Sequence, residues 1–162
     1  MKRKEFNNAV DLYSHSLYGF ALRFLQNPED ANDVVQDTFE KLWVHCEKID
    51  HNKCKSWLFT CANNAMLNMV SRKRRVIFSS YDNLPEIYGN YDSSFEYKQV
   101  VERVISCLPP VQKSILLLRD LEGYSYKEIA QMLDLSSSQV KVYLFRARNK
   151  VKKQLIQLKI AV

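Results

Sequence analysis

SYKEIAQMLDLSSSQVKVYLFRAR, residues 125–148, predicts two short helices joined by a tight turn. Ser125 and Glu128 have the spacing of a capping box, in which each side chain bonds the other residue's backbone amide. Ser136 begins a second box of the same kind, and Asp134 tolerates the left-handed backbone that the turn between the helices needs. Two capped helices in this order are typical of a helix-turn-helix that binds DNA, although an ordinary helical hairpin would have the same spacing.

The second of these helices is predicted to have one apolar and one basic face. Val140, Leu144 and Ala147 recur once per turn and predict the buried face. The side chains that fall mostly off this face are those of Lys141, Phe145, Arg146 and Arg148. No acidic residue follows Lys141, and the chain carries a net charge of +6. This basic end permits a polyanionic partner, and a solvated basic surface would look the same.

Apolar residues recur at helical spacing over most of the chain, which predicts an all-α fold. Intervals of three and four predict a first helix over residues 3–25. Asn27 and Pro28 predict the start of a second helix, because asparagine caps helix N-termini and proline fits the first turn. We expect this second helix to bury Leu42 and Trp43.

The predicted helices group into two small domains. A third helix over residues 56–75 completes a helical bundle over residues 1–75. Residues 76–99 are acidic, mix Ser, Asn, Pro and Gly with isolated aromatics, and predict a flexible linker. Residues 100–162 form the second domain, which contains the helix-turn-helix. The pattern leaves the arrangement of the two domains open.

Two polar surfaces are predicted on the first domain. Asp33, Gln36 and Asp37 lie on the outer face of its second helix, where a merely solvated acidic face has the same pattern. Asn64 and Asn68 lie on one face of the third helix. This face continues into a basic run, Arg72, Lys73, Arg74 and Arg75.

The sequence gives no support for a catalytic or metal site. It has no glycine-rich phosphate loop and no recognisable pairing of a nucleophile with a base, so we expect no enzymatic activity and no cofactor. Zinc is the alternative to consider, because His45, Cys46, His51, Cys54 and Cys61 lie within a short span. Their spacing matches no familiar set of ligands, and Cys61 falls on an apolar stripe, so we expect no metal.

The sequence also predicts the compartment. The first residues lead into an amphipathic helix rather than an apolar run, so we expect no signal peptide. No apolar stretch is long enough to cross a bilayer, and we expect no direct insertion into a membrane. We therefore expect a cytoplasmic protein with reduced cysteines.

Three motifs, in this order, resemble the sigma-70 family of RNA polymerase sigma factors in its short extracytoplasmic-function (ECF) form. DANDVVQDTFEKLW, residues 30–43, resembles the acidic helix of region 2.2. SWLFTCANNAMLNMVSRKRR, residues 56–75, resembles regions 2.3 and 2.4. LPPVQKSILLLRDLEGYSYKEIAQMLDLSSSQVKVYLFRAR, residues 108–148, resembles region 4. The resemblance covers nearly the whole chain and implies a sigma factor that directs promoter recognition and DNA melting.

The resemblance assigns roles to the surfaces described above. It implies that Asp33, Gln36 and Asp37 contact the clamp coiled coil of core RNA polymerase, whose flap is the partner of region 4. It implies that promoter DNA at the −10 element is contacted by Asn64, Asn68, Arg72, Lys73, Arg74 and Arg75. It implies that the −35 element is contacted by Ser137, Ser138, Gln139, Lys141, Phe145, Arg146 and Arg148. An anti-sigma factor that masks the polymerase-binding surfaces is a further implied partner.

Five positions depart from the family pattern, and one of them is Asp134, which replaces a frequent turn glycine. Val142 stands where the family often has serine, and Tyr143 where it often has arginine, so we expect an unusual −35 preference. Thr60 replaces a common arginine, and Met69 a common aromatic residue. The rival interpretation is a regulator of another class, which would bind a palindrome without polymerase and use residues 1–75 to sense a signal or to dimerise.

Overall fold

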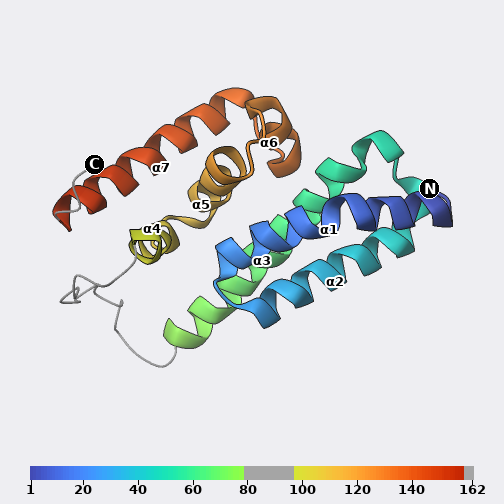
Figure 1. Ribbon diagram of the computed structural model, residues 1–162, viewed down its shortest axis with the longest axis horizontal. Coiled ribbons are helices and arrows are strands. Elements are labelled where there is room, and N and C mark those ends of the chain that lie inside the picture. Colours follow the sequence, from blue (N-terminus) through green and yellow to red (C-terminus); the bar gives the residue numbers. More distant parts are fainter. Residues whose placement is uncertain (79–96, 159–162) are drawn as a thin grey trace.

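The computed structural model describes residues 1–78 and 97–158, and within these ranges every regular element is a helix (Figure 1). The N-terminal half holds α1 (Arg3–Leu25), α2 (Pro28–His45) and α3 (Cys54–Phe78), with the short 3-10 turns η1 (Cys46–Lys48) and η2 (His51–Lys53) between α2 and α3. The C-terminal half holds α4 (Tyr97–Ser106), α5 (Pro110–Leu116), the π-helical turn η3 (Leu117–Leu121), α6 (Tyr126–Leu133) and α7 (Ser137–Gln157). The all-α prediction is confirmed.

The linker prediction falls mostly on residues outside the described ranges. Residues 79–96 are not described, so the structure carries no statement about them. At the two ends of the predicted linker the chain is helical instead, because α3 continues to Phe78 and α4 begins at Tyr97. Helix α3 is therefore longer than predicted, because the third helix was expected to end at residue 75.

The turn between α1 and α2 forms as its sequence predicts. Gln26 has a left-handed backbone, with φ of 57°. Oδ1 of Asn27 accepts hydrogen bonds from the backbone N–H groups of Glu29 (2.9 Å) and Asp30 (3.1 Å). Pro28 occupies the first turn, where no N–H is needed. These contacts satisfy the free amides at the start of α2 and direct it back along α1.

The core of the N-terminal half corrects one sequence expectation. Leu17 of α1, Leu42 of α2 and Leu58 of α3 are completely buried. Trp43, which was expected to be buried beside Leu42, is 50% exposed. Its ring packs edge-on against that of Phe6, with 5.0 Å between the ring centroids. Neighbouring positions on a helix point about 100° apart, so Leu42 and Trp43 cannot share the face that meets α3.

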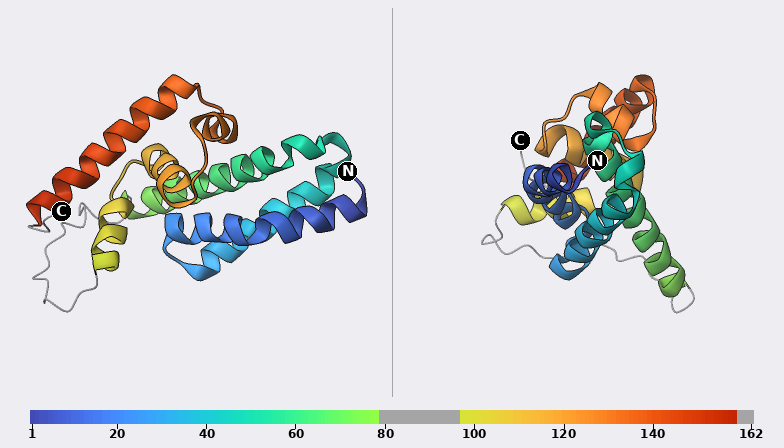
Figure 2. Two further views of the ribbon diagram at one scale, coloured as in Figure 1. Left: turned by 45° about the horizontal axis from the view of Figure 1, so that its top comes forward. Right: turned by 90° about the vertical axis from the view of Figure 1, so that its right-hand side faces the viewer.

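In the C-terminal half, α5 is the central helix against which α7 packs (Figure 2). Gly123, with φ of 76°, ends the segment after η3 in a conformation that favours glycine. At the far end of α7, Leu155 packs against Val100 and Val104 of α4. Helices α4, α5 and α6 therefore cover one side of α7 and leave its other side to solvent.

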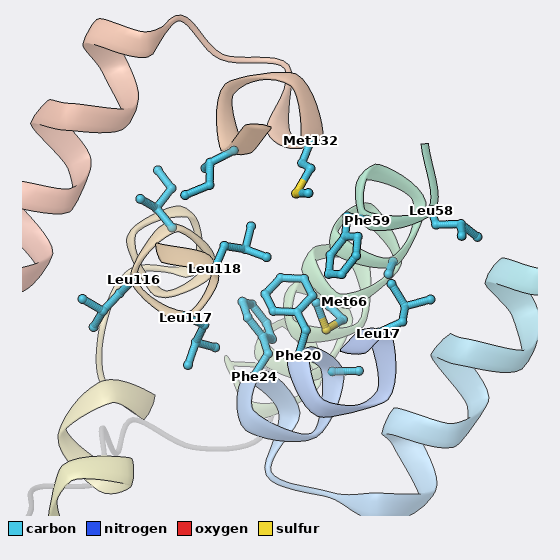
Figure 3. Packing of buried hydrophobic residues seen from close by; sticks show 14 of the residues in the cluster. Leu17, Phe20, Phe24, Leu58, Phe59, Met66, Leu116, Leu117, Leu118 and Met132 are labelled. Atoms are coloured by element: carbon cyan, nitrogen blue, oxygen red, sulfur yellow. The ribbon is translucent and has the colours of Figure 1, made fainter. Parts of the chain in front are cut away.

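The two halves share one hydrophobic core (Figure 3). Phe20 of α1 and Phe59 and Met66 of α3 point toward Leu118 of η3 and Met132 of α6. The rings of Phe20 and Phe59 lie 5.7 Å apart. All five side chains are completely buried. Since α3 packs on α1 and α2 with one face and on α6 with another, it has two buried faces, and the sequence indicated only the first.

Polar contacts also join the two halves. Oγ of Ser114 in α5 donates a buried hydrogen bond of 2.6 Å to Oδ1 of Asn63 in α3. Oγ1 of Thr60, at the position where the family often has arginine, donates to the backbone carbonyl of Met132 in α6. Two further ion pairs cross between the halves, Lys55–Glu128 and Arg23–Glu122. These contacts fix the register of α5 and α6 on α3.

Lys113 is the charged residue buried at this contact. Its side chain lies beneath the C-terminal end of α1, with Nζ 4.5 Å from the centre of the Phe24 ring. Burial lowers the pKa of Lys113 to about 8. Among the described residues no carboxylate forms an ion pair with it.

None of the helices in the described ranges is both long and apolar enough to cross a membrane.

Candidate nucleic-acid interface

The turn between α6 and α7 is fixed by side chains at both helix starts. The Ser125 hydroxyl accepts from the Glu128 N–H at 3.1 Å, and the Glu128 carboxylate accepts from the Ser125 N–H at 2.9 Å. Ser136 and Gln139 form the same pair of bonds at 3.1 and 2.9 Å. Asp134 lies between them with φ of 54° and ψ of 49°. Both predicted capping boxes and the left-handed turn residue are confirmed, and α6 and α7 form a helix-turn-helix.

The face of α7 that points away from the protein holds the predicted −35 residues. Val140, Leu144 and Ala147 are buried against the rest of the C-terminal half, as predicted. The seven predicted contact residues are all exposed, namely Ser137, Ser138, Gln139, Lys141, Phe145, Arg146 and Arg148. The N-terminal part of α7 therefore presents hydroxyl, amide, aromatic and cationic groups together, next to the free amides of a helix start.

Arg148 differs from the other cations of α7 because a carboxylate of the protein holds it. Its Nε and Nη2 donate to the two oxygens of Asp120, at 3.1 and 2.6 Å. This bidentate pair raises the pKa of Arg148 above its ordinary value. Among the described residues no carboxylate pairs with Lys141 or Arg146. In this arrangement Arg146 is free to meet a phosphate or base, whereas Arg148 also fixes α7 to the segment before it.

The predicted −10 residues all lie on α3, but not on one side of it. At about 100° per residue, Lys73 and Arg74 point well away from the side that carries Asn64, Asn68, Arg72 and Arg75. Asn64, Asn68, Arg72, Arg74 and Arg75 are exposed and extend over the second half of the helix. Lys73 is exposed as well, and its Nζ lies 2.5 Å from a carboxylate oxygen of Asp30 in α2. Along the axis of α3 the exposed side chains therefore change from amides, which can bond base edges, to cations, which can bond phosphates.

The structure brings two of the predicted polymerase contacts next to the −10 residues. Asp33 and Asp37 of α2 line one open groove together with Asn68, Arg72 and Lys73 of α3. Asp37 also holds Lys41 at 2.6 Å, and this hydrogen bond raises the pKa of Lys41. Asp33 and Asp37 thus face the same groove as Arg72 and Lys73, which the sequence did not indicate.

Gln36, the third predicted polymerase contact, lies apart from the other two. It lines a groove between α1 and α2 whose other walls include Val35, Phe39, Trp43 and Phe6. Sequence reasoning missed this apolar groove because it placed Trp43 in the core. The sequence does carry a sign of it, because Val35, Phe39 and Trp43 recur every four residues, on a face separate from that of Val34 and Leu42.

The cysteine and histidine residues considered for zinc are not gathered into a metal site in the described residues. Cys54 is buried, and Cys61 is partly buried. Burial raises the pKa of both thiols, which disfavours the thiolate form that binds metal. No group of three or more His, Cys, Asp or Glu side chains in the described ranges is placed to hold a metal ion.

The comparisons with known proteins agree with the motifs of the two halves. Residues 9–76 match the family model described as Sigma-70 region 2, and residues 98–151 match the model described as Sigma-70, region 4. The chain is 31% identical over 145 residues to the ECF RNA polymerase sigma factor SigM of Bacillus subtilis, covering 87% of this chain and 89% of that protein. It is 31% identical over 164 residues to the ECF RNA polymerase sigma-E factor of Escherichia coli, covering 92% and 85%.

A solved structure has a similar fold. It is the sigma factor RpoE of Bartonella quintana in complex with the anti-sigma factor NepR, with a TM-score of 0.73 and 25% sequence identity. The match covers 94% of this chain and 97% of that one. The similarity therefore extends over both halves.

Proposed function

Because this chain belongs to the sigma-70 family and is an ECF RNA polymerase sigma factor, we propose that its two exposed basic surfaces bind the −35 and −10 elements of a promoter. The observation that carries this proposal is the outer face of α7, which is rich in cations, contains no acidic residue and follows a capped helix-turn-helix. The chain supplies no chemistry of its own in this function. It positions core RNA polymerase, and the polymerase forms the phosphodiester bonds.

At the −35 element, α7 enters the major groove with its N-terminal part. The groove admits an α-helix, and the base edges at its floor present hydrogen-bonding groups between two rows of phosphates. Ser137, Ser138 and Gln139 lie at the leading end, while Lys141 and Arg146 reach bases or phosphates. Phe145 lies between these two cations along the helix. Arg148 can contact a phosphate only if it gives up at least one of its two hydrogen bonds to Asp120.

At the −10 element, α3 supplies the contacts. Asn64 and Asn68 bond the edges of unpaired bases, because an amide offers a donor and an acceptor side by side. The cations Arg72, Lys73, Arg74 and Arg75 neutralise the strand's phosphates. The segment from Glu47 to Lys55 is the rim of the pocket for a base that is turned out of the helix.

The acidic groups of α2 dock the chain on polymerase. Asp33 and Asp37 face the groove next to α3, and Gln36 faces the apolar groove next to α1, so two sides of α2 take part. The clamp coiled coil of core polymerase is the partner of this surface, and the flap is the partner of the C-terminal half. An anti-sigma factor competes for the same surfaces. The solved complex of the sigma factor RpoE with the anti-sigma factor NepR, whose fold this chain resembles, supports this part of the proposal. The chain acts in the cytoplasm, where polymerase and promoter are.

The test is transcription by core RNA polymerase with and without the chain. DNA sequences are first selected from a random pool with the reconstituted complex, and run-off transcripts are then measured from the selected duplex. We expect transcripts only when the chain is present, and equal output without it would refute the function. Arg146→Ala is expected to reduce promoter binding about tenfold or more. Lys4→Ala, which removes an exposed cation of α1 that belongs to neither predicted set of DNA contacts, is the matched control.

A second pair of measurements separates the rival interpretation. A sigma factor binds its promoter tightly only in complex with core polymerase, whereas a regulator of another class binds a palindrome alone. Gel shifts with and without core polymerase distinguish these outcomes. Asp33→Ala is expected to weaken the binding of core polymerase to the chain in the absence of DNA. Asn64→Ala, at an exposed position of α3 that does not line the groove of Asp33, is expected to leave that binding unchanged.

A further inference from the structure

Two large apolar side chains lie next to each other on the outer face of α7. Val142 is 47% exposed and Phe145 is 67% exposed. Residues three apart on a helix are surface neighbours, so the two side chains form one apolar patch. Phe145 is among the predicted −35 contacts. Val142 is not among them, although it stands where the resembled family often has serine.

The patch lies at the centre of the outer face rather than at its edge. At about 100° per residue, Val142 points within about 20° of the direction opposite the buried stripe of Val140, Leu144 and Ala147, and Phe145 within about 50° of it. Lys141 flanks the patch on one side and Arg146 on the other. An apolar centre between two cationic margins has the same layout as a DNA groove, in which base edges lie between two rows of phosphates.

The chemistry of the base edges identifies what this patch can contact. In the major groove each base pair presents donors and acceptors, and the only apolar group is the 5-methyl of thymine. Valine has no hydrogen-bonding group in its side chain, so a Val142 that faces the groove gains most from that methyl. The absence of acidic residues along α7 also favours a nucleic acid over a basic protein as the occupant of this face.

We propose that Val142 is a specificity-determining residue that contacts a thymine 5-methyl in the −35 element, with Phe145 completing the apolar surface around that methyl. The inference rests on the proposed function, because it requires α7 in the major groove. It adds a chemical preference to that function: the chain selects thymine over other bases opposite Val142 by burying a methyl group, where a serine at this position would form a hydrogen bond instead.

The experiment removes the methyl group from the DNA. The complex of the chain with core polymerase is bound to the selected promoter, and each thymine of the −35 element is replaced in turn by uracil, which lacks only the 5-methyl. At one or two positions we expect about a fourfold loss of affinity, since burial of one methyl group is worth about a factor of four. For Val142→Ala, we expect the ratio between thymine and uracil DNA at that position to fall to about one.

Ile156→Ala is the matched control variant. Ile156 is 61% exposed on the same helix, about 21 Å further along its axis, and this variant is expected to keep the wild-type ratio. Both substitutions are at exposed positions, and unchanged circular dichroism and melting show that the fold is intact.

Three outcomes would overturn the proposal. The first is equal affinity of the wild-type complex for thymine and uracil at every −35 position, and the second is an unchanged ratio in Val142→Ala. The third is a loss of binding to core polymerase without DNA in Val142→Ala, which would make the patch a protein contact. If a scrambled −35 sequence binds as well as the selected one, and Arg146→Ala has no effect, the proposed function itself fails, so the two failures are distinguishable.

Discussion

Tyr124→Ala tests whether the two halves of the chain are stabilised by each other. Tyr124 belongs to the C-terminal half, but its ring packs edge-on against Phe59 of α3, with 5.2 Å between the centroids. Nζ of Lys55, also in α3, lies 4.2 Å from the centre of the same ring. The substitution therefore removes contacts that belong to the joint between the halves.

The size of the effect follows from these contacts. An edge-to-face aromatic pair contributes about 1 kcal/mol beyond the burial of its surface. A partly exposed cation over an aromatic ring contributes about 0.5–1 kcal/mol. The buried surface of the ring is lost as well, so we expect Tyr124→Ala to lower the free energy of unfolding by at least about 2 kcal/mol. This corresponds to about 1 M or more in the midpoint of a urea titration for a slope of about 2 kcal/mol per M.

The assay uses the distribution of tryptophan in the chain. Both tryptophans, Trp43 and Trp57, lie in the N-terminal half, so tryptophan fluorescence reports unfolding of the half that is not mutated. We expect the fluorescence midpoint to fall by the same amount, about 1 M or more, and to coincide with the midpoint from circular dichroism. Phe145→Ala, which removes an exposed ring from the C-terminal half, should change the free energy by less than about 0.5 kcal/mol. An unchanged fluorescence midpoint in Tyr124→Ala, with a dichroism curve that splits into two steps, would refute the reasoning.

Three other predictions concern single positions. The pKa of Lys113 is about 8 in the folded chain and near 10.5 when unfolded, so the unfolded state binds more protons between these values and stability rises with pH across that window. Lys113→Met should be more stable than the wild type by up to about 3 kcal/mol at pH 7 in urea titrations, and a difference that does not shrink between pH 8 and 10.5 would contradict this. Asp134→Gly should raise the free energy of unfolding by about 0.5–1 kcal/mol, since glycine adopts the left-handed turn without strain; a lower melting temperature would show that the Asp134 side chain is needed. Asn27→Ala should cost about 1 kcal/mol through loss of two capping bonds, against no change for the exposed Asn7→Ala control.

The local features of the fold could be read from the sequence because they depend on neighbouring residues. A capping box or an asparagine before proline is satisfied within four positions, so the starts of α2, α6 and α7 were predicted correctly. The buried stripe of α7, Val140 to Ala147, was predicted for the same reason.

The features that were missed depend on residues far apart in the chain. Phe59, Asn63 and Met66 face the C-terminal half, and no periodicity within α3 distinguishes a second buried face from an irregular first one. The pairing of Arg148 with Asp120 depends on how α7 packs, which spacing along one helix does not determine. The roles given to the exposed residues of α3 and α7 stay predictions, because exposure and charge are properties of many solvated helices as well.

The hydrogen bond between Asn63 and Ser114 has a consequence for how readily the molecule can open. An apolar contact resists separation in proportion to the surface it would expose to water, whereas an amide, a hydroxyl and an ammonium group gain hydration when they are uncovered. The contact between the two halves contains both apolar and polar groups, because Phe59 and Met132 lie beside Asn63, Ser114 and Lys113. The apolar side chains favour contact between the two halves. The three polar groups lose less when the halves separate, because water can replace their partners. A molecule that binds α3 at this contact should therefore shift the balance toward separated halves.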